Sequence, residues 1–324
     1  MALISEISRG SGQRSVAELR QAALAQFIAA FALAAYVHFY EMTGNADKPR
    51  DKSDQFSAGD TRTTSTDYTV KEREPNFADV TLRIYGDKVE TDIAHERRGQ
   101  DIGSQRLLDL EDFCESLGWY FMDALINHDN GASAEQFTGL KAQAAAHARN
   151  TVLDDGSGNG FALITGNDNA ARQRHDAFIE ALDAAIEDIV GGPDVITMDG
   201  KSISRFTSVA RGLVTYSTVR NVFGAEERVA SYRDIPIVNS GFKNDGAGLV
   251  IPHNETVGTS TDCTSIYLAR FGEKRHVSLA TNVGLDVQDM GLIGTKWQSL
   301  VEFDVDLVVL HDKAFKRLSG LRIV

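Results

Sequence analysis

The sequence predicts an α+β protein, because helical and strand-like periodicities both occur and no repeating strand–helix–strand rhythm connects them. Residues 101–128 carry one apolar stripe at steps of three and four residues, which indicates a long amphipathic helix. Residues 301–307 alternate apolar and acidic side chains, which is the period of a half-buried strand. Between the chain start and these elements, residues 47–79 are highly charged and poor in apolar side chains. We therefore expect a mixed fold with one projecting segment.

Length and composition exclude several classes of protein. The 324 residues are enough for two ordinary domains or one large elaborated domain, so the chain can bury a sizeable core without disulfides. Its two cysteines, Cys114 and Cys263, lie far apart in the sequence and indicate a reducing compartment. The net charge of −13 argues against direct binding of nucleic acid, which requires clustered Lys and Arg.

The apolar stretch from Ala22 to Val37 has two interpretations. Three arginines precede it and small residues follow at 32–35, as in a secretory signal peptide. However, Glu18 and Gln26 interrupt the stretch, and it is short for a membrane span. We expect a helix within 15–43 that buries Phe27, Phe31 and Ala34 and runs into a strand at residues 36–42.

The segment 44–79 is the most unusual part of the sequence. It begins with the turn signal Gly44-Asn45, and charges of both signs follow in close succession. Connections of this length in compact domains are usually functional or disordered. The Thr-rich residues 61–70 favour extended structure, so we expect a solvent-exposed two-stranded hairpin that needs another surface to lie on. Its large apolar side chains are Phe56, Tyr68, Val70 and Phe77, and Phe56 and Tyr68 are the candidate anchors.

Residues 80–128 predict a strand and then the longest helix. Alternation on both sides of Gly86-Asp87 fits either a tight hairpin or one long strand with a bulge over 80–94, and we prefer the long strand. The helix could be capped by Ser104 or Asp101. Its apolar stripe comprises Leu107, Leu110, Cys114, Leu117, Phe121 and Leu125.

The rest of the chain alternates short strands and helices. A loop at 151–169 with a short strand at 161–165 precedes an amphipathic helix at 171–190, which ends at Gly191-Gly192-Pro193. We further expect strands at 195–198, 235–238, 266–271 and 301–310, and helices at 202–211 and, short and basic, at 313–318.

Signals for catalysis or ligand binding are weak. Gly156 to Gly160 resembles a phosphate cradle, but no strand precedes it and no Lys-Ser/Thr pair follows, so we expect a loop. It also resembles a calcium loop, yet Gly166 occupies the position of the bidentate Glu. The carboxylates of Glu302, Asp304 and Asp306 are expected on a solvated or subunit-facing strand face. We predict no catalytic, cofactor-binding or metal-binding residue and no cofactor.

Several stretches, in this order, resemble the major capsid proteins of tailed bacteriophages. They include the segment entering an extended loop, the strand before a long spine helix, a helix-to-strand junction and the closing strand. The matching stretches are residues 36–53, 82–92, 137–141, 191–194 with Met198, 232–238, 265–272 and 305–311 with Ala314. Their order and spacing over residues 36–324, rather than any single motif, make up the resemblance.

This resemblance implies the Hong Kong 97-like capsid fold. It implies an N-terminal arm at 1–43, an extended loop at 44–79 and a peripheral domain at 80–169 with the spine helix at 101–128. It further implies an axial domain at 170–290 and a returning strand with the C-terminal segment at 291–324. Some proteins with this fold cross-link through a Lys–Asn bond. Lys48, Lys52 and Lys71 lie in that region, but no motif identifies a partner residue.

The resemblance also implies a function. It predicts a non-enzymatic homo-oligomer, arranged as pentamers and hexamers in an icosahedral shell around double-stranded DNA, without sequence-specific binding and without a membrane. Scaffolding, portal and decoration proteins are further expected partners. The expected location is the virion capsid, assembled in the host cytoplasm. The alternatives are an encapsulin-type nanocompartment shell, a soluble hydrolase and another self-assembling virion part such as a tail protein.

Overall fold

The computed structural model describes residues 16–52, 59–71, 75–98, 102–146, 149–166, 168–220, 226–244, 246 and 248–324. The helices are α2 (Val16–Ala30), α3 (Ala94–Arg97), α4 (Ile102–Asn127), α5 (Leu140–Ala146), α6 (Asn169–Glu187) and α7 (Gly200–Val209). The first eight strands are β1 (Phe39–Glu41), β2 (Ala46–Asp47), β3 (Val80–Thr81), β4 (Arg83–Asp92), β5 (Asn150–Val152), β6 (Phe161–Leu163), β7 (Val195–Met198) and β8 (Val214–Arg220). The remaining strands are β9 (Glu226–Tyr232), β10 (Ile235–Asn239), β11 (Glu255–Val257), β12 (Ser260–Ala269), β13 (Val277–Thr281), β14 (Leu285–Ile293), β15 (Lys296–Val309) and β16 (Phe315–Ile323). This mixture confirms the predicted α+β class.

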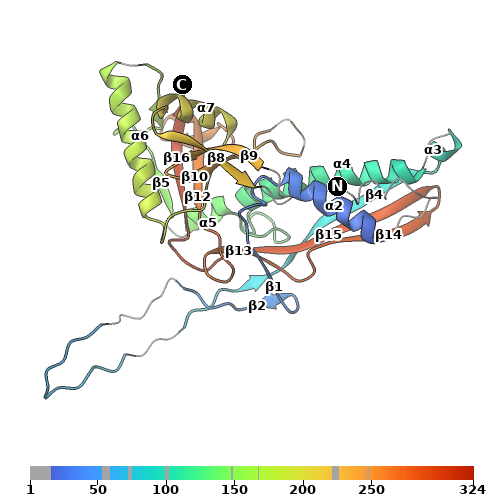
Figure 1. Cartoon of the computed structure of the whole chain (residues 1–324), viewed down its shortest axis with the longest axis horizontal. Helices are drawn as coiled ribbons and strands as arrows, with labels where there is room; N and C mark the ends of the chain where they lie inside the picture. Colours follow the sequence, from blue (N-terminus) through green and yellow to red (C-terminus); the bar gives the residue numbers. More distant parts are fainter. Residues whose placement is uncertain are drawn as a thin grey trace.

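The first unit is an elongated sheet covered on one face by α2 and α4 (Figure 1). Within the described residues its strand order is β1-β13-β15-β14, and β4 pairs with the other edge of β15. The alternating residues of β15 point Val301 and Phe303 into this core, as the period-two pattern predicted. The rings of Phe27 and Phe121 lie 5.7 and 5.3 Å from that of Phe303, so both helices meet the sheet at one aromatic cluster.

The strand β4 confirms the prediction of one long strand rather than a hairpin. Its pairing with β15 runs without a register shift from Arg83 to Asp92, so the expected bulge at Gly86-Asp87 is not formed. Gly86 lies where the two backbones approach closely. A Cβ atom there would lie 2.0 Å from the carbonyl oxygen of Val301, so a larger residue would separate the strands.

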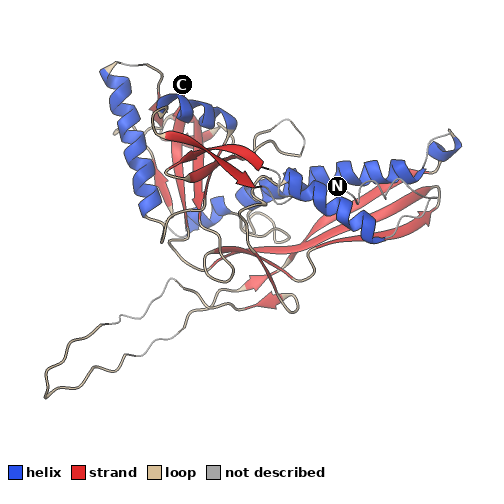
Figure 2. Ribbon diagram, in the orientation of Figure 1, coloured by secondary structure: helices blue, strands red, loops and turns tan. Residues whose placement is uncertain are grey.

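The second unit is built on a nine-stranded sheet at the other end of the molecule (Figures 1 and 2). Its strand order among the described residues is β5-β16-β12-β7-β10-β9-β8, with β11 paired to β12 and β6 to β16. Helices α6 and α7 bury Phe178 and Phe206 against it. Each helix begins at an aspartate that caps backbone N–H groups, Asp168 for α6 and Asp199 for α7.

The predicted helices at 101–128, 171–190 and 202–211 are confirmed within a few residues by α4, α6 and α7. Ser104 lies inside α4, which begins at Ile102, whereas Asp101 falls outside the described residues. The helix before Gly191 ends as predicted. Gly191 and Gly192 both adopt positive φ angles there, which other residues rarely adopt.

The N-terminal helix is shorter than expected. It ends at Ala30, and the strand that follows is only Phe39–Glu41. Phe27 and Phe31 are buried against α4, in agreement with a packed helix, and Ala34 is partly buried. No helix among the described residues is long and apolar enough to cross a membrane.

The short basic helix predicted at 313–318 is wrong. Residues from Phe315 onward form the strand β16, which pairs with β12 along most of its length. Lys316 and Arg317 can occupy a central strand because acidic groups are placed beside them. Lys316 Nζ lies 2.8 Å from Asp188, and Arg317 Nη2 lies 2.6 Å from Glu255. These partners are distant in sequence, so local pattern could not reveal them.

Candidate functional site

The arm, defined as residues 44–79, is fixed to the body at a small hydrophobic cluster that we call the root. This cluster lies on the face of the first sheet opposite to α2 and α4, where the strand β1 and the residues flanking the arm pack together. Asn45 accepts a hydrogen bond from Leu82 N, and β2 pairs with β3. The root comprises Tyr40, Met42, Val80, Leu82, Ala280, Val308 and Leu310, all of them buried.

Beyond the root, pairing between the two limbs of the arm decreases. Arg50 and Phe77 form an isolated antiparallel bridge, and Lys52 N donates to Leu310 O at 2.7 Å. No strand is present in the described distal residues, 59–71. The predicted two-stranded hairpin is thus wrong for this part of the arm. Two strands without a third surface gain too little buried area to stay paired in water.

The distal arm is exposed along its whole described length. Every residue from 59 to 71 is exposed, and Val70 exposes 84% of its surface. Local contacts shape the segment: Thr66 N donates to Thr63 O, and the Arg62 guanidinium lies 5.4 Å from the centre of the Tyr68 ring. The arm therefore projects away from both units (Figures 1 and 2). Phe56, predicted as an anchor, lies outside the described residues.

The charges of the arm contribute little to the stability of the single chain. Lys48 pairs with Asp79 at 2.9 Å, but both side chains are about three-quarters exposed. Exposed pairs of this kind are worth about 0–1 kcal/mol. Lys48, Lys52 and Lys71 are all exposed. The arm is therefore a surface of available polar and apolar groups rather than part of a core.

The three carboxylates predicted on a solvated or subunit-facing strand face do not share one environment. Asp306 Oδ2 accepts a hydrogen bond of 3.0 Å from Thr81 N, on the arm's return limb. Burial raises the pKa of the Asp306 carboxyl to about 6, and hydrogen bonds from Thr81 and Leu307 only partly oppose that effect. Asp306 is partly buried, and the arm's return limb contacts it, so the predicted face is covered in part at this position. Sequence alternation places Asp306 on this face but does not show that the arm covers it.

The Gly-rich loop predicted at 156–160 is confirmed as a tight turn. Asp154 and Gly160 bridge its two ends. The Asp155 carboxylate accepts hydrogen bonds from Ser157 N and Asn159 N, which lower its pKa. These bonds use the carboxylate to close the turn. No group of metal-ligating side chains is found among the described residues.

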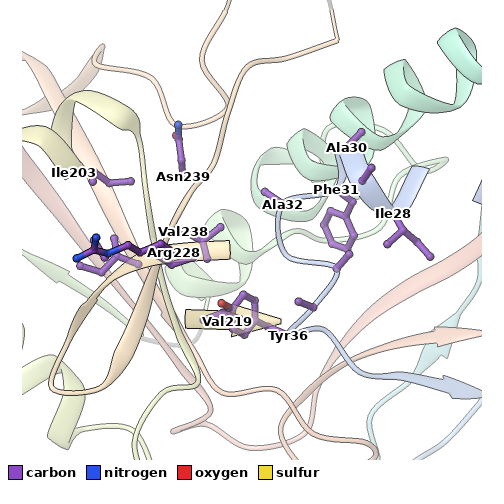
Figure 3. A pocket seen from close by; sticks show the side chains of 16 residues that line it. Ile28, Ala30, Phe31, Ala32, Tyr36, Ile203, Val219, Arg228, Val238 and Asn239 are labelled. Carbon is purple, nitrogen blue, oxygen red and sulfur yellow. The ribbon is translucent and has the colours of Figure 1, made fainter. Parts of the chain in front are cut away.

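A hollow of about 480 Å³ lies between the end of α2 and the strands β8, β9 and β10. Figure 3 shows that most side chains around it are aliphatic, such as Ile28, Ile203 and Val238, together with Arg228 and Asn239. Among its lining residues there is no pair of a nucleophile and a base. The hollow therefore lacks the chemical groups that a hydrolase needs.

One cluster that the sequence analysis missed has a superficial likeness to a catalytic triad. His253 Nε2 lies 2.8 Å from Asp199, and Ser202 donates to the same buried carboxylate. Burial acts to raise the pKa of Asp199, but the hydrogen bonds from His253 and Ser202 outweigh it and hold the pKa low. Because serine and histidine both bind the aspartate, no base faces the serine. The cluster fastens the loop at His253 to α7, and Asp199 followed by Ser202 is the sequence signal of its helix cap.

No family model matches the sequence, and no curated protein matches it. Solved structures do match. The SrpI encapsulin of Synechococcus elongatus PCC 7942 superposes with a TM-score of 0.59 at 16% identity, over 98% of this chain and 95% of that chain. A subunit of the satellite phage P4 procapsid superposes with a TM-score of 0.54 at 10% identity, over 94% and 100%. A capsid of an empty GTA particle gives 0.54 at 14% identity, over 97% and 92%.

The chain has the Hong Kong 97-like capsid fold. The neighbours with this fold form an encapsulin, a procapsid and a capsid, and they share it with nearly the whole length of this chain. The predicted fold is therefore confirmed. At 10–16% identity the likeness extends to the fold and leaves function to be argued from this chain's own surfaces.

Proposed function

We propose that this chain is a shell-forming subunit, and specifically a major capsid protein that encloses the double-stranded DNA of a tailed phage. The observation that carries the proposal is the arm. It is held by its own root at one end, while its described distal residues, 59–71, are exposed without a surface of their own. A segment of this kind gains its contacts from a neighbouring copy. The fold, whose neighbours form closed particles, supports the same interpretation.

The two units suit this role in different ways. We propose that the unit of α2, α4 and the first sheet is the peripheral domain and that the nine-stranded unit is the axial domain. The axial domain would then also take in β5, β6 and β16, which lie outside the range 170–290 expected from the sequence. A flat subunit with an arm touches several neighbours, so that interfaces of modest size add up.

The acidic composition fits a container for DNA. With a net charge of −13, the protein shell would attract the DNA phosphates only weakly. Packaged DNA would therefore remain free to move. We expect pentamers and hexamers in the shell, assembly in the host cytoplasm, and scaffolding, portal or decoration proteins as further partners. The DNA would be enclosed without sequence-specific contacts.

A second candidate is an encapsulin-type shell that holds a protein cargo. It is favoured by the likeness to the SrpI encapsulin, which has a TM-score of 0.59. The two candidates differ in their content. Shells purified from the native source would contain nuclease-protected DNA in the first case and a protein cargo in the second.

Negative-stain microscopy of the purified protein tests the proposal. We expect closed shells several hundred ångströms across, and a uniform small particle under all solution conditions would contradict it. A variant with residues 60–71 replaced by a short Gly-Ser linker should stay folded and fail to form shells. The matched control is a Gly-Ser insertion after Ser157, in an exposed turn away from the arm, which should assemble like the wild type. Assembly of the linker variant would show that the arm is not needed.

A further inference from the structure

We propose that the turn at residues 310–314, which we call the hub, fastens the arm to the body in an acid-sensitive way, and that protonation of His311 loosens it. The proposal concerns the single folded chain. Its consequence for shells, a looser arm under acidic conditions, rests on the function proposed above.

The hub connects β15 to β16 and holds the arm and both units by backbone hydrogen bonds. Leu310, a buried member of the root, accepts a hydrogen bond of 2.7 Å from Lys52 N in the outgoing limb of the arm. Its own N–H donates to His276 O in the first unit. Further along the turn, Lys313 O accepts from Val190 N, just after α6 in the second unit. A change in the hub therefore acts on the arm and on both units.

The hydrogen bonding of His311 defines its protonation state. Lys313 N donates to His311 Nδ1 over 3.0 Å, so this ring nitrogen carries no proton. The ring is then neutral with its proton on Nε2, and an added proton can bind only to Nδ1. That proton would point at the Lys313 N–H and break the bond. The direction of the switch follows from this geometry, because acid removes a hydrogen bond that closes the turn.

The burial of the ring acts in the same direction. His311 is 9% exposed, and its ring centre lies 6.2 Å from that of His276, which is 6% exposed. His276 Nδ1 is buried without a hydrogen-bond partner among the described residues. Burial is the main cause that lowers the pKa of both histidines. Two buried imidazoles this close together are more stable neutral than charged.

The charged groups around the two rings oppose one another in part. Asp312 and Asp51 raise the pKa of His311, whereas Arg149 and Lys313 lower it. The Arg149 guanidinium lies 2.7 Å from the Asp312 carboxylate, so these two charges partly cancel. The groups that act on His276, besides His311, are Arg270, Arg275 and Asp194. The lost hydrogen bond and the burial of the ring therefore determine the sign of the effect.

The pH range follows from the ordinary pKa of histidine. When the hub opens, His311 regains its ordinary pKa of 6.5. The closed hub therefore has its full stability above pH 6.5 and loses it progressively as the pH falls below that value. Between pH 7.5 and pH 5 the opening equilibrium should shift about 5-fold toward the open state, the effect of one lost hydrogen bond together with a buried charge.

Hydrogen exchange on unassembled subunits tests the proposal, with rates corrected for the pH dependence of intrinsic amide exchange. We expect the protection of Lys52 and of residues 310–314 to fall about 5-fold from pH 7.5 to pH 5, while segments in β12 change little. His311→Asn supplies an oxygen that can accept from the N–H two residues on and takes up no proton, so it should give high protection at both pH values. His38→Asn, at an exposed histidine, is the matched control and should behave like the wild type.

Two results would overturn the proposal: unchanged wild-type protection over this range, or a pH dependence that persists in His311→Asn. If that variant does not fold, nitrogen-15 spectra of the histidine rings in the wild type decide. Among the eight histidines, one should carry its proton on Nε2 and titrate below pH 6.5 in step with the exchange. If no ring does so, the proposal is wrong. Because the subunits are unassembled, a failure to form shells would leave these readouts unaffected.

Discussion

The arm and the first unit, which contains α4 and its sheet, differ in how far their apolar side chains are buried. In α4 the apolar stripe is satisfied within the chain, and Leu110, Cys114 and Phe121 are almost completely buried. In the arm, Tyr68 and Val70 expose 57% and 84% of their surfaces. The apolar contacts that stabilise the fold therefore lie in the two units, and the proposed role of the arm is contact between copies. Three substitutions can break or sharpen this distinction.

The largest effect is expected for Phe121→Ala. The Phe121 ring is 1% exposed and lies within 5.7 Å of the rings of Phe27, Phe31 and Phe303, so the change would empty the centre of the first core. Substitutions of this kind cost about 3–5 kcal/mol in the free energy of unfolding. Urea denaturation of the unassembled subunit would measure it. A loss below about 1 kcal/mol would mean that this cluster does not hold the unit together.

An intermediate effect is expected for Asp199→Asn in the second unit. Asparagine still caps α7, but the charged partner of His253 is lost, which should cost about 2–3 kcal/mol at neutral pH. Since the folded pKa of Asp199 is lowered, its carboxylate stabilises the fold above the ordinary aspartate pKa and ceases to do so as the pH falls. In urea denaturation, the difference in the free energy of unfolding between wild type and variant should therefore shrink progressively as the pH is lowered below 3.8.

The control for this prediction is Asp168→Asn at the start of α6. Asp168 caps its helix through Ala171 N in the same manner, yet it is exposed. Asparagine and aspartate cap about equally well, so the control should lose less than about 0.5 kcal/mol. Equal losses in both variants would show that the histidine contact adds nothing to the cap.

The smallest effect on stability is expected for Tyr68→Ala in the arm. The side chain is exposed and its ring contacts only the nearby Arg62 among the contacts described, so the free energy of unfolding should change by less than about 0.5 kcal/mol. The same variant should raise the protein concentration needed for shell formation, as followed by light scattering. A clear loss of subunit stability without an effect on assembly would reverse the roles of the two regions.

Sequence reasoning succeeded where burial is periodic and local. Helices α4 and α6 and the strand β7 were predicted to within a few residues, because an apolar stripe or a short apolar run is sufficient to define them. It missed β8, β9 and the pair β13 and β14. The strands β8 and β14 lie at the edges of their sheets and mix polar and apolar residues, whereas β13 is buried but only five residues long. For such strands the pairing partner, rather than the pattern, decides the structure.

The arm illustrates the same division at the level of function. By itself, the sequence determined that residues 44–79 are exposed, charged and bounded by a turn and a strand, because composition and turn chemistry are local properties. Only the tertiary structure decided that Asp306 lies under the returning limb, that Arg317 has Glu255 beside it in a strand, and that the distal arm remains unpaired. The physical reason is that desolvation, ion pairing and strand pairing depend on partners that lie far away along the chain.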